Sequence, residues 1–188
     1  MSEAGARGPH PLRLFFALWP SALERNALAI ATGAAVAQVD GQAVPASNLH
    51  VTLAFLGSVA GETFARLVEI GGMGDWPRVE LDFERLEFWP KPKVLVAMAS
   101  RTPVEGIEIV DRLWQRIEAL GIGRETRPWH PHLTLVRRVR RPPPESLRIS
   151  AGPPASPTAA RFGLALVEST THASGARYKA LAEWPLGR

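Results

Sequence analysis

The chain contains no cysteine, and this absence removes several kinds of chemistry at once. Disulfide bonds, thiolate zinc sites, iron–sulfur clusters and cysteine nucleophiles are all excluded. Long apolar runs are also missing, because no stretch approaches the roughly 18 apolar residues of a membrane helix. The short apolar segment at residues 12–19 contains Arg13 and is followed by no small-residue cleavage site, so it predicts a strand rather than a secretory signal. We therefore expect a cytoplasmic protein without a membrane partner.

The composition is that of a folded protein with a mild basic bias. Of the 188 residues, 46% are hydrophobic and 21% are charged, which suffices for one domain with its own core. The net charge of +4 favours anionic partners through electrostatic steering but identifies none of them. Residues 1–11 hold several glycines and prolines, so we expect a flexible tail there and a single bilobal domain over residues 12–188.

The spacing of apolar residues predicts a mixture of strands and helices. Strands are expected at residues 13–18, 50–56, 79–88, 94–99, 131–137, 161–168 and 177–184, and helices at residues 22–39, 62–70 and 103–121. The connections are too short for many parallel crossovers, which favours antiparallel sheets. In each half of the chain a long helix leads into a His-x-Thr strand. The sequence therefore predicts an α+β fold with two pseudo-symmetric lobes, each an antiparallel sheet flanked by helices, around a central cleft.

The strand that begins at His50 alternates between polar and apolar residues. Side chains two positions apart in a strand share a face, so we expect Val51, Leu53 and Phe55 to point into the core. His50 and Thr52 then lie together on the opposite face. A single histidine in such a strand is more often a structural residue than a catalyst. The motif on its own is therefore weak evidence of function.

The same arrangement recurs at His132-Leu133-Thr134-Leu135, again with histidine and threonine on one face. Two such copies in a chain with five histidines point to function. Near neutral pH, an imidazole with a pKa of about 6.5 can serve as an acid or as a base. Hydrolysis of a phosphodiester needs both, because one group takes a proton from water and another protonates the departing ribose oxygen. The threonine hydroxyls could donate hydrogen bonds to the phosphate oxygens.

Arg137 lies five residues beyond His132, so in a regular strand it would point away from that histidine. It reaches the same pocket only if the strand twists or ends there, and otherwise it is an ordinary surface residue. Other arginines crowd the same segment, and such runs are usually solvated faces. They are Arg124, Arg127, Arg138, Arg140 and Arg141.

Together the two motifs resemble those of the two-histidine phosphoesterases, a family defined by paired His-x-Thr/Ser-x motifs in two pseudo-symmetric lobes. Within that family, the chain is similar to the RNA 2′,3′-cyclic phosphodiesterases, formerly described as 2′-5′ RNA ligases. The resemblance covers nearly the whole chain from Arg13. It is carried by residues 13–18, 48–57, 91–95, 128–135 and 174–178.

The resemblance implies an enzyme that opens a 2′,3′-cyclic phosphate at an RNA 3′ end and leaves a 2′-phosphate, without a metal or other cofactor. His50 would protonate the leaving 3′ oxygen, and His132 would accept a proton from the attacking water. Thr52, Thr134 and Arg137 would hold the phosphate. The expected partners are RNA with 2′,3′-cyclic phosphate ends or cyclic nucleotides, and we expect the protein to act as a monomer.

Several alternatives stay open. The segment His130-Pro131-His132 could suggest a metal pair, but zinc takes about three or four protein ligands and no fitting carboxylates accompany it, so we predict no metal site. Phe15, Trp129 and Tyr178 could each stack on a base or belong to the core. The chain could also join RNA ends as a 2′-5′ ligase by reversal of the same displacement, or bind RNA or nucleotides without catalysis. The proline-rich stretch at residues 142–157 has no predicted role.

Overall fold

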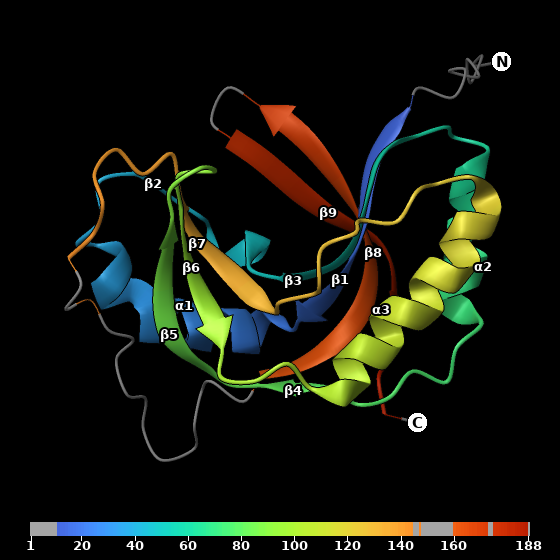
Figure 1. Cartoon of the computed structure of the whole chain (residues 1–188), viewed down its shortest axis with the longest axis horizontal. Coiled ribbons are helices and arrows are strands. Elements are labelled where there is room, and N and C mark those ends of the chain that lie inside the picture. Colours follow the sequence, from blue (N-terminus) through green and yellow to red (C-terminus); the bar gives the residue numbers. More distant parts are fainter. Residues whose placement is uncertain (1–10, 145–146, 148–159, 173–174, 188) are drawn as a thin grey trace, which may run out of the picture.

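The computed structural model describes residues 11–144, 147, 160–172 and 175–187 (Figure 1). Its strands are β1 (Leu12–Pro20), β2 (Gln42–Ala43), β3 (Val51–Val59), β4 (Glu80–Leu81), β5 (Phe83–Trp89), β6 (Val94–Ala99), β7 (His132–Arg137), β8 (Ala160–His172) and β9 (Gly175–Trp184). The helices are α1 (Ala22–Val36), α2 (Thr63–Gly72) and α3 (Val104–Ile117), with short 3₁₀ turns at Ala46–Asn48 and Glu118–Leu120. Apart from Pro11, the predicted tail lies outside the described residues.

The strands form two antiparallel sheets, which confirms the predicted α+β class. One sheet has five strands in the order β3-β1-β8-β4, with β9 also paired to β8. The other has four strands in the order β2-β7-β6-β5. Figure 1 shows α2 and α3 beyond the five-stranded sheet, on the side away from β5, β6 and β7. The two histidine motifs lie on different sheets, with His50 just before β3 and His132 at the start of β7.

The helices begin and pack as their sequences predict. A capping box starts α1, in which the Ser21 hydroxyl accepts a hydrogen bond from the Glu24 backbone N–H and the Glu24 carboxylate accepts one from the Ser21 N–H. Along α3, Ile109, Leu113 and Ile117 recur at intervals of four and are all buried. The helix α3 contacts β3 and α2, whereas α1 contacts β1 and β8 of one sheet and β7 of the other.

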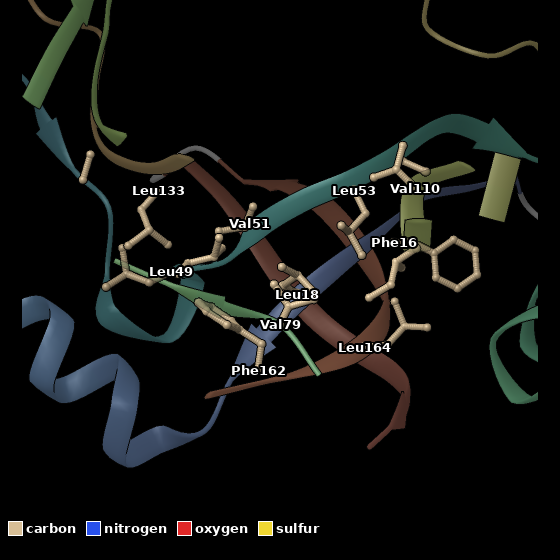
Figure 2. Packing of buried hydrophobic residues seen from close by; sticks show 14 of the residues in the cluster. Phe16, Leu18, Leu49, Val51, Leu53, Val79, Val110, Leu133, Phe162 and Leu164 are labelled. Atoms are coloured by element: carbon tan, nitrogen blue, oxygen red, sulfur yellow. The ribbon is translucent and has the colours of Figure 1, made fainter. Parts of the chain in front are cut away.

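One cluster of buried hydrophobic side chains joins the two sheets (Figure 2). Phe16 and Leu18 contribute to it from β1, and Leu133 contributes from β7. All three side chains are fully buried. Figure 2 shows Leu133 beside Leu49 and Val51, where β7 contacts β3. The opposite face of β7 carries His132 and Thr134, whereas that of β1 carries Phe15, Ala17 and Trp19 in a smaller buried cluster.

The single strand predicted over residues 79–88 is wrong. The chain changes sheets within it, because β4 pairs with β8 whereas β5 pairs with β6. Val79, Leu81 and Phe83 nevertheless belong to the same buried cluster on both sides of the change. The alternation of apolar residues from Val79 to Phe83 crosses the change of sheets without a break, so the pattern could not reveal a change of partner strand.

Smaller differences concern the ends of elements. The short strand β2 lies between residues 39 and 50, where no strand or helix was predicted, and α1 ends at Val36 rather than at residue 39. Strand β8 continues to His172, beyond the predicted end at residue 168. Of the proline-rich stretch, only residues 142–144 and 147 are described. In the part of the chain that the structure describes, every helix is too short or too polar to span a membrane.

Candidate active site

The two histidine motifs meet at one cavity between the sheets. It has a volume of about 410 Å³ and is lined by residues of both sheets. From the first sheet come His50, Thr52 and Phe55 with β3, Arg13 and Phe15 of β1, and Ser169, Thr171, Ala176 and Tyr178 of β8 and β9. From the second come His132, Thr134 and Arg137 of β7. All five site residues predicted from the sequence therefore line the same cavity.

Both histidines are held in the same orientation. The Nδ1 atom of His50 lies 2.7 Å from the carbonyl oxygen of Asn48, and Nδ1 of His132 lies 2.8 Å from the carbonyl oxygen of His130. A carbonyl oxygen only accepts, so each Nδ1 carries the proton and donates it. The Nε2 atom of each neutral ring is then unprotonated. At His50, this Nε2 lies 3.2 Å from the Thr52 hydroxyl, which donates to it.

Strand β3 carries a β-bulge within its motif. Its pairing with β1 steps from Thr52 opposite Ala17 to Ala54 opposite Phe16, so Leu53 is an extra residue. Leu53 and Ala54 are consequently both buried, and the alternation changes phase after them. Phe55 is 39% exposed and lines the cavity with His50. The prediction that Phe55 points into the core is therefore wrong.

Strand β7 carries a bulge at the corresponding place. Thr134 pairs with Val96 and Val136 pairs with Leu95, so Leu135 is the extra residue. Leu135 and Val136 are both buried. The bulge returns Arg137 to the face of Thr134, although a regular strand would have placed it on the other side. One guanidinium nitrogen of Arg137 also donates a hydrogen bond of 3.2 Å to the Tyr178 hydroxyl.

Aromatic rings enclose His50. The centroids of the Phe15, Tyr178 and Trp19 rings lie 4.9, 5.0 and 5.8 Å from the centroid of the His50 ring. Burial among them lowers the pKa of His50 from 6.5 to about 4, because a charged ring loses hydration there. From the sequence, Phe15 and Tyr178 could either belong to the core or stack on a base. In the structure both pack against the imidazole.

Charges and hydrogen bonds act on the same ring with smaller effects. The hydrogen bond to the Asn48 carbonyl favours the charged ring and raises the pKa of His50. The positive charge of Arg137, and that of His132 when its ring is protonated, act in the other direction and lower it. The influence of His132 on His50 follows from their sharing one cavity. In the free protein His50 is therefore neutral at pH 7.

The surroundings of His132 are more open. Its ring contacts one aromatic side chain, Trp89, at a centroid distance of 4.5 Å. Burial lowers the pKa of His132 below its usual value, and the hydrogen bond to the His130 carbonyl partly offsets this change. His132 is also neutral at pH 7, with Nε2 unprotonated.

Trp129 supports the site from the second lobe. Its indole N–H donates a 2.8 Å hydrogen bond to the backbone carbonyl of Thr52. The ring lies against Gly106 of α3, where an added Cβ would come within 2.4 Å of it. Trp129 therefore ties α3 to the His50 strand, a role that the sequence did not indicate.

The remaining basic residues divide into two groups. Arg124, Arg127 and Arg140 form ion pairs with Asp111, Glu125 and Asp40, as expected for a solvated face. Among the described residues Arg137 and Arg138 form no ion pair, and both line cavities next to the histidines. Within the described residues, His, Asp and Glu side chains form no group of three or more that could hold a metal ion.

Known proteins with similar sequences all point to one superfamily. The sequence model of the 2′-5′ RNA ligase superfamily matches residues 19–168. An RNA 2′,3′-cyclic phosphodiesterase of Escherichia coli K12 is 31% identical over 182 residues, which cover 94% of this chain and 97% of the relative. A protein of the same name from Archaeoglobus fulgidus is 31% identical over 106 residues, or 55% of this chain and 59% of the relative.

Solved structures agree with the sequence matches. LigT of Escherichia coli, crystallised in complex with 3′-AMP, is 28% identical and superposes with a TM-score of 0.75 over 95% of this chain and 99% of that one. A protein of Thermus thermophilus is 26% identical, with a TM-score of 0.75 over 93% of this chain and 98% of that one. These matches confirm the family resemblance inferred from the two motifs. The chain belongs to the 2′-5′ RNA ligase superfamily.

Proposed function

We propose that this protein hydrolyses 2′,3′-cyclic phosphate ends of RNA to 2′-phosphates, using His50 and His132 as its proton donor and acceptor. The observation that carries the proposal is that two histidines from different sheets line one cavity, each with its Nε2 atom unprotonated. The superfamily membership and the names of the relatives support the same reaction.

The fixed tautomer suits both rings to proton transfer. Because the Nδ1 proton of each ring is hydrogen-bonded to a backbone carbonyl, each ring exchanges protons at Nε2. A neutral ring can accept a proton there, and a protonated ring can donate one. The tautomer is the same for His50 and His132, so it does not distinguish their roles.

The proposed reaction is a single in-line displacement. Water attacks the phosphorus while His132 takes its proton, the bond from phosphorus to the 3′ oxygen breaks, and His50 protonates that oxygen. The products are a 2′-phosphate and a 3′-hydroxyl. His50 must carry a proton for this step, yet its pKa is about 4 in the free protein. A bound phosphate anion would raise that pKa by Coulomb attraction, so binding of the substrate favours protonation of His50.

The other cavity residues are suited to holding the phosphate. The hydroxyls of Thr52 and Thr134 can donate hydrogen bonds to the non-bridging oxygens, and Arg137 can neutralise their charge. The bulge in β7 supports the role of Arg137, and each bulge brings the third residue after its threonine to the cavity side. In one motif that residue is Phe55, and in the other it is Arg137.

A direct test uses RNA that ends in a 2′,3′-cyclic phosphate, incubated with the protein in the presence of a chelator. Accumulation of a 2′-phosphate end supports the reaction, its regiochemistry and its independence of metal. A 3′-phosphate would refute the assigned leaving group. Loss of activity with the chelator, and its return on adding a divalent metal ion, would refute metal independence.

Ligation is a second candidate, because the matching family is described by a 2′-5′ RNA ligase activity. The same displacement run with the 5′-hydroxyl of a second RNA as the nucleophile would form a 2′-5′ linkage. Adding such an RNA to the assay separates the two reactions by product length. Binding without turnover of the cyclic phosphate would instead indicate a non-catalytic RNA-binding module.

A further inference from the structure

A second cavity opens from the candidate active site toward one end of the four-stranded sheet. It has a volume of about 700 Å³ and shares Arg137, Thr171, Ala176 and Tyr178 with the first cavity. Its walls come from β2, from the turn before β6, from the end of β7 and from the β8–β9 hairpin, which Figure 1 shows rising beside the four-stranded sheet. We call it the arginine trough, after Arg137, Arg138 and Arg177 in its lining.

The charge of the arginine trough is of one sign. Its lining holds those three arginines and His172, and it includes neither aspartate nor glutamate. Across the described parts of the chain, none of the three arginines forms an ion pair, unlike Arg124, Arg127 and Arg140. Cations without carboxylate partners beside a phosphate site favour a further anionic ligand.

The backbone at the rim of the trough is unusual. Arg138 has a φ of 52° and Lys93 has a φ of 54°, and among the described residues they are the two positive values outside glycine. They lie side by side, because the Val139 N–H donates a 2.9 Å hydrogen bond to the Lys93 carbonyl. Glycine or asparagine would adopt this conformation at lower cost. The sequence instead has a cation at both positions, which suggests that their charge is used.

The other cavity next to the site differs in character. It has a volume of about 800 Å³ and shares Thr52, Phe55 and His132 with the candidate active site. Three tryptophans line it, together with Arg124, Arg127, Glu118 and Glu125, so the positive and negative side chains balance. Such a surface suits a planar base rather than a row of phosphates. Of the two cavities beside the site, the arginine trough has the charge that a polyanion requires.

An RNA that ends in a 2′,3′-cyclic phosphate continues in one direction only, through the phosphodiesters on its 5′ side. We propose that the arginine trough binds this upstream strand and that Arg138 and Arg177 contact its phosphates. The inference rests on the proposed function and deepens it. The preferred substrate is an RNA strand of several nucleotides rather than a cyclic mononucleotide, because a mononucleotide leaves the trough empty.

The test compares 2′,3′-cyclic AMP with a six-nucleotide RNA ending in a 2′,3′-cyclic phosphate. The variant is Arg138→Gly with Arg177→Ala, because glycine fits the positive φ at position 138 and both side chains are exposed. We expect kcat/KM of the wild-type protein to be at least about tenfold higher for the hexamer. The variant should lose that advantage and keep its activity on cyclic AMP within about twofold. On the hexamer, log kcat/KM should decrease with log salt less steeply for the variant than for the wild type. The two slopes should differ by about 1.4, as expected for the loss of two phosphate contacts.

The matched control is Arg101→Ala, an exposed arginine beyond the opposite end of β6 from the trough. It should behave as wild type on both substrates. Equal kcat/KM for hexamer and cyclic AMP in the wild-type protein would overturn the inference while leaving the proposed function intact. So would a variant that loses activity equally on both.

If the wild-type protein turned over neither substrate, the proposed function would be refuted. Binding of the RNA strand in the arginine trough would then be tested by a binding measurement without turnover. A fluorescent hexamer with a 3′-phosphate should bind the wild-type protein at least about tenfold more tightly than it binds the double variant. An excess of ATP should compete less well than unlabelled hexamer, since a free triphosphate is too short to follow the trough. Equal affinity of the two proteins would refute the inference, and so would better competition by ATP.

Discussion

At the scale of single residues, the two histidines share a tautomer but differ in their surroundings. Both Nδ1 atoms donate to a backbone carbonyl two residues earlier in the chain. His50 is packed among three aromatic rings, whereas in the described part of the chain His132 meets one, that of Trp89. Burial is the largest cause of the lowered pKa at both rings, and at His50 it lowers the pKa to about 4.

The low pKa of His50 predicts a pH-dependent stability. The unfolded chain binds a proton at this ring near pH 6.5, whereas the folded protein binds it only near pH 4. Between these values the unfolded state holds more protons, so stability falls as the pH falls. Comparing urea unfolding at pH 7 and pH 4.5, we expect the wild type to lose about 2 kcal/mol more than His50→Gln, at 1.36 kcal/mol per pKa unit. Equal losses in the two proteins would contradict the assigned pKa.

At the scale of elements, the bulges mark the limit of what the sequence could predict. The histidine and threonine of each motif fall on one face by simple alternation, and the structure agrees. Alternation alone placed Phe55 in the core and put Arg137 in the pocket only if the strand twisted or ended. Nothing in the local sequence shows where an extra residue enters a strand. Leu53 and Leu135 are apolar like their neighbours, and each becomes an extra residue only through pairing with β1 or β6.

Pairing with distant strands explains the other differences as well. Ser169 and Thr171 line the cavity from the part of β8 that lies beyond its predicted end. In this part β8 pairs with β9. Their polar side chains break the apolar pattern that defined the predicted strand. Cavity residues of this kind become visible only once the partner strand is known.

The contact between α3 and β3 gives a prediction for Gly106. A Cβ at this position would lie 2.4 Å from the Trp129 ring, so the ring must move. Its hydrogen bond to the Thr52 carbonyl would then be lost or weakened. We expect Gly106→Ala to destabilise the protein by about 1–3 kcal/mol and to lower kcat/KM for the cyclic phosphate. Denaturant unfolding and steady-state kinetics measure the two effects.

Gly33 of α1 provides the matched control, because nothing lies within 4 Å of a Cβ added there. In that helix Gly33→Ala should raise stability by about 0.5–1 kcal/mol and leave kcat/KM unchanged. If the two alanine variants behaved alike, the link between α3 and the His50 strand would be wrong.

At the scale of the whole molecule, one hydrophobic cluster joins the two sheets. Leu14 and Leu166 of the five-stranded sheet belong to it together with Leu95 and Leu133 of the four-stranded sheet. Neither sheet could unfold without exposing part of the same cluster. The two histidines are consequently held across the cavity by a shared core rather than by two separate ones.

This shared core predicts one cooperative unfolding transition. Tryptophan fluorescence and far-ultraviolet circular dichroism should give coincident denaturant curves, as expected for a two-state domain. Each lobe carries tryptophans that would report its own unfolding, such as Trp19 on β1 and Trp89 on β5. Two separated transitions would show that the lobes are independent.

The central claim is that His50 and His132 act together on one phosphorus atom. It is tested most directly by the rate of hydrolysis of an RNA 2′,3′-cyclic phosphate by His50→Ala, His132→Ala and the double variant. We predict that each single substitution lowers kcat about 10²- to 10⁴-fold with unchanged circular dichroism, and that the double variant is little worse, since the pair works as a unit. Near wild-type turnover in either single variant would contradict the account.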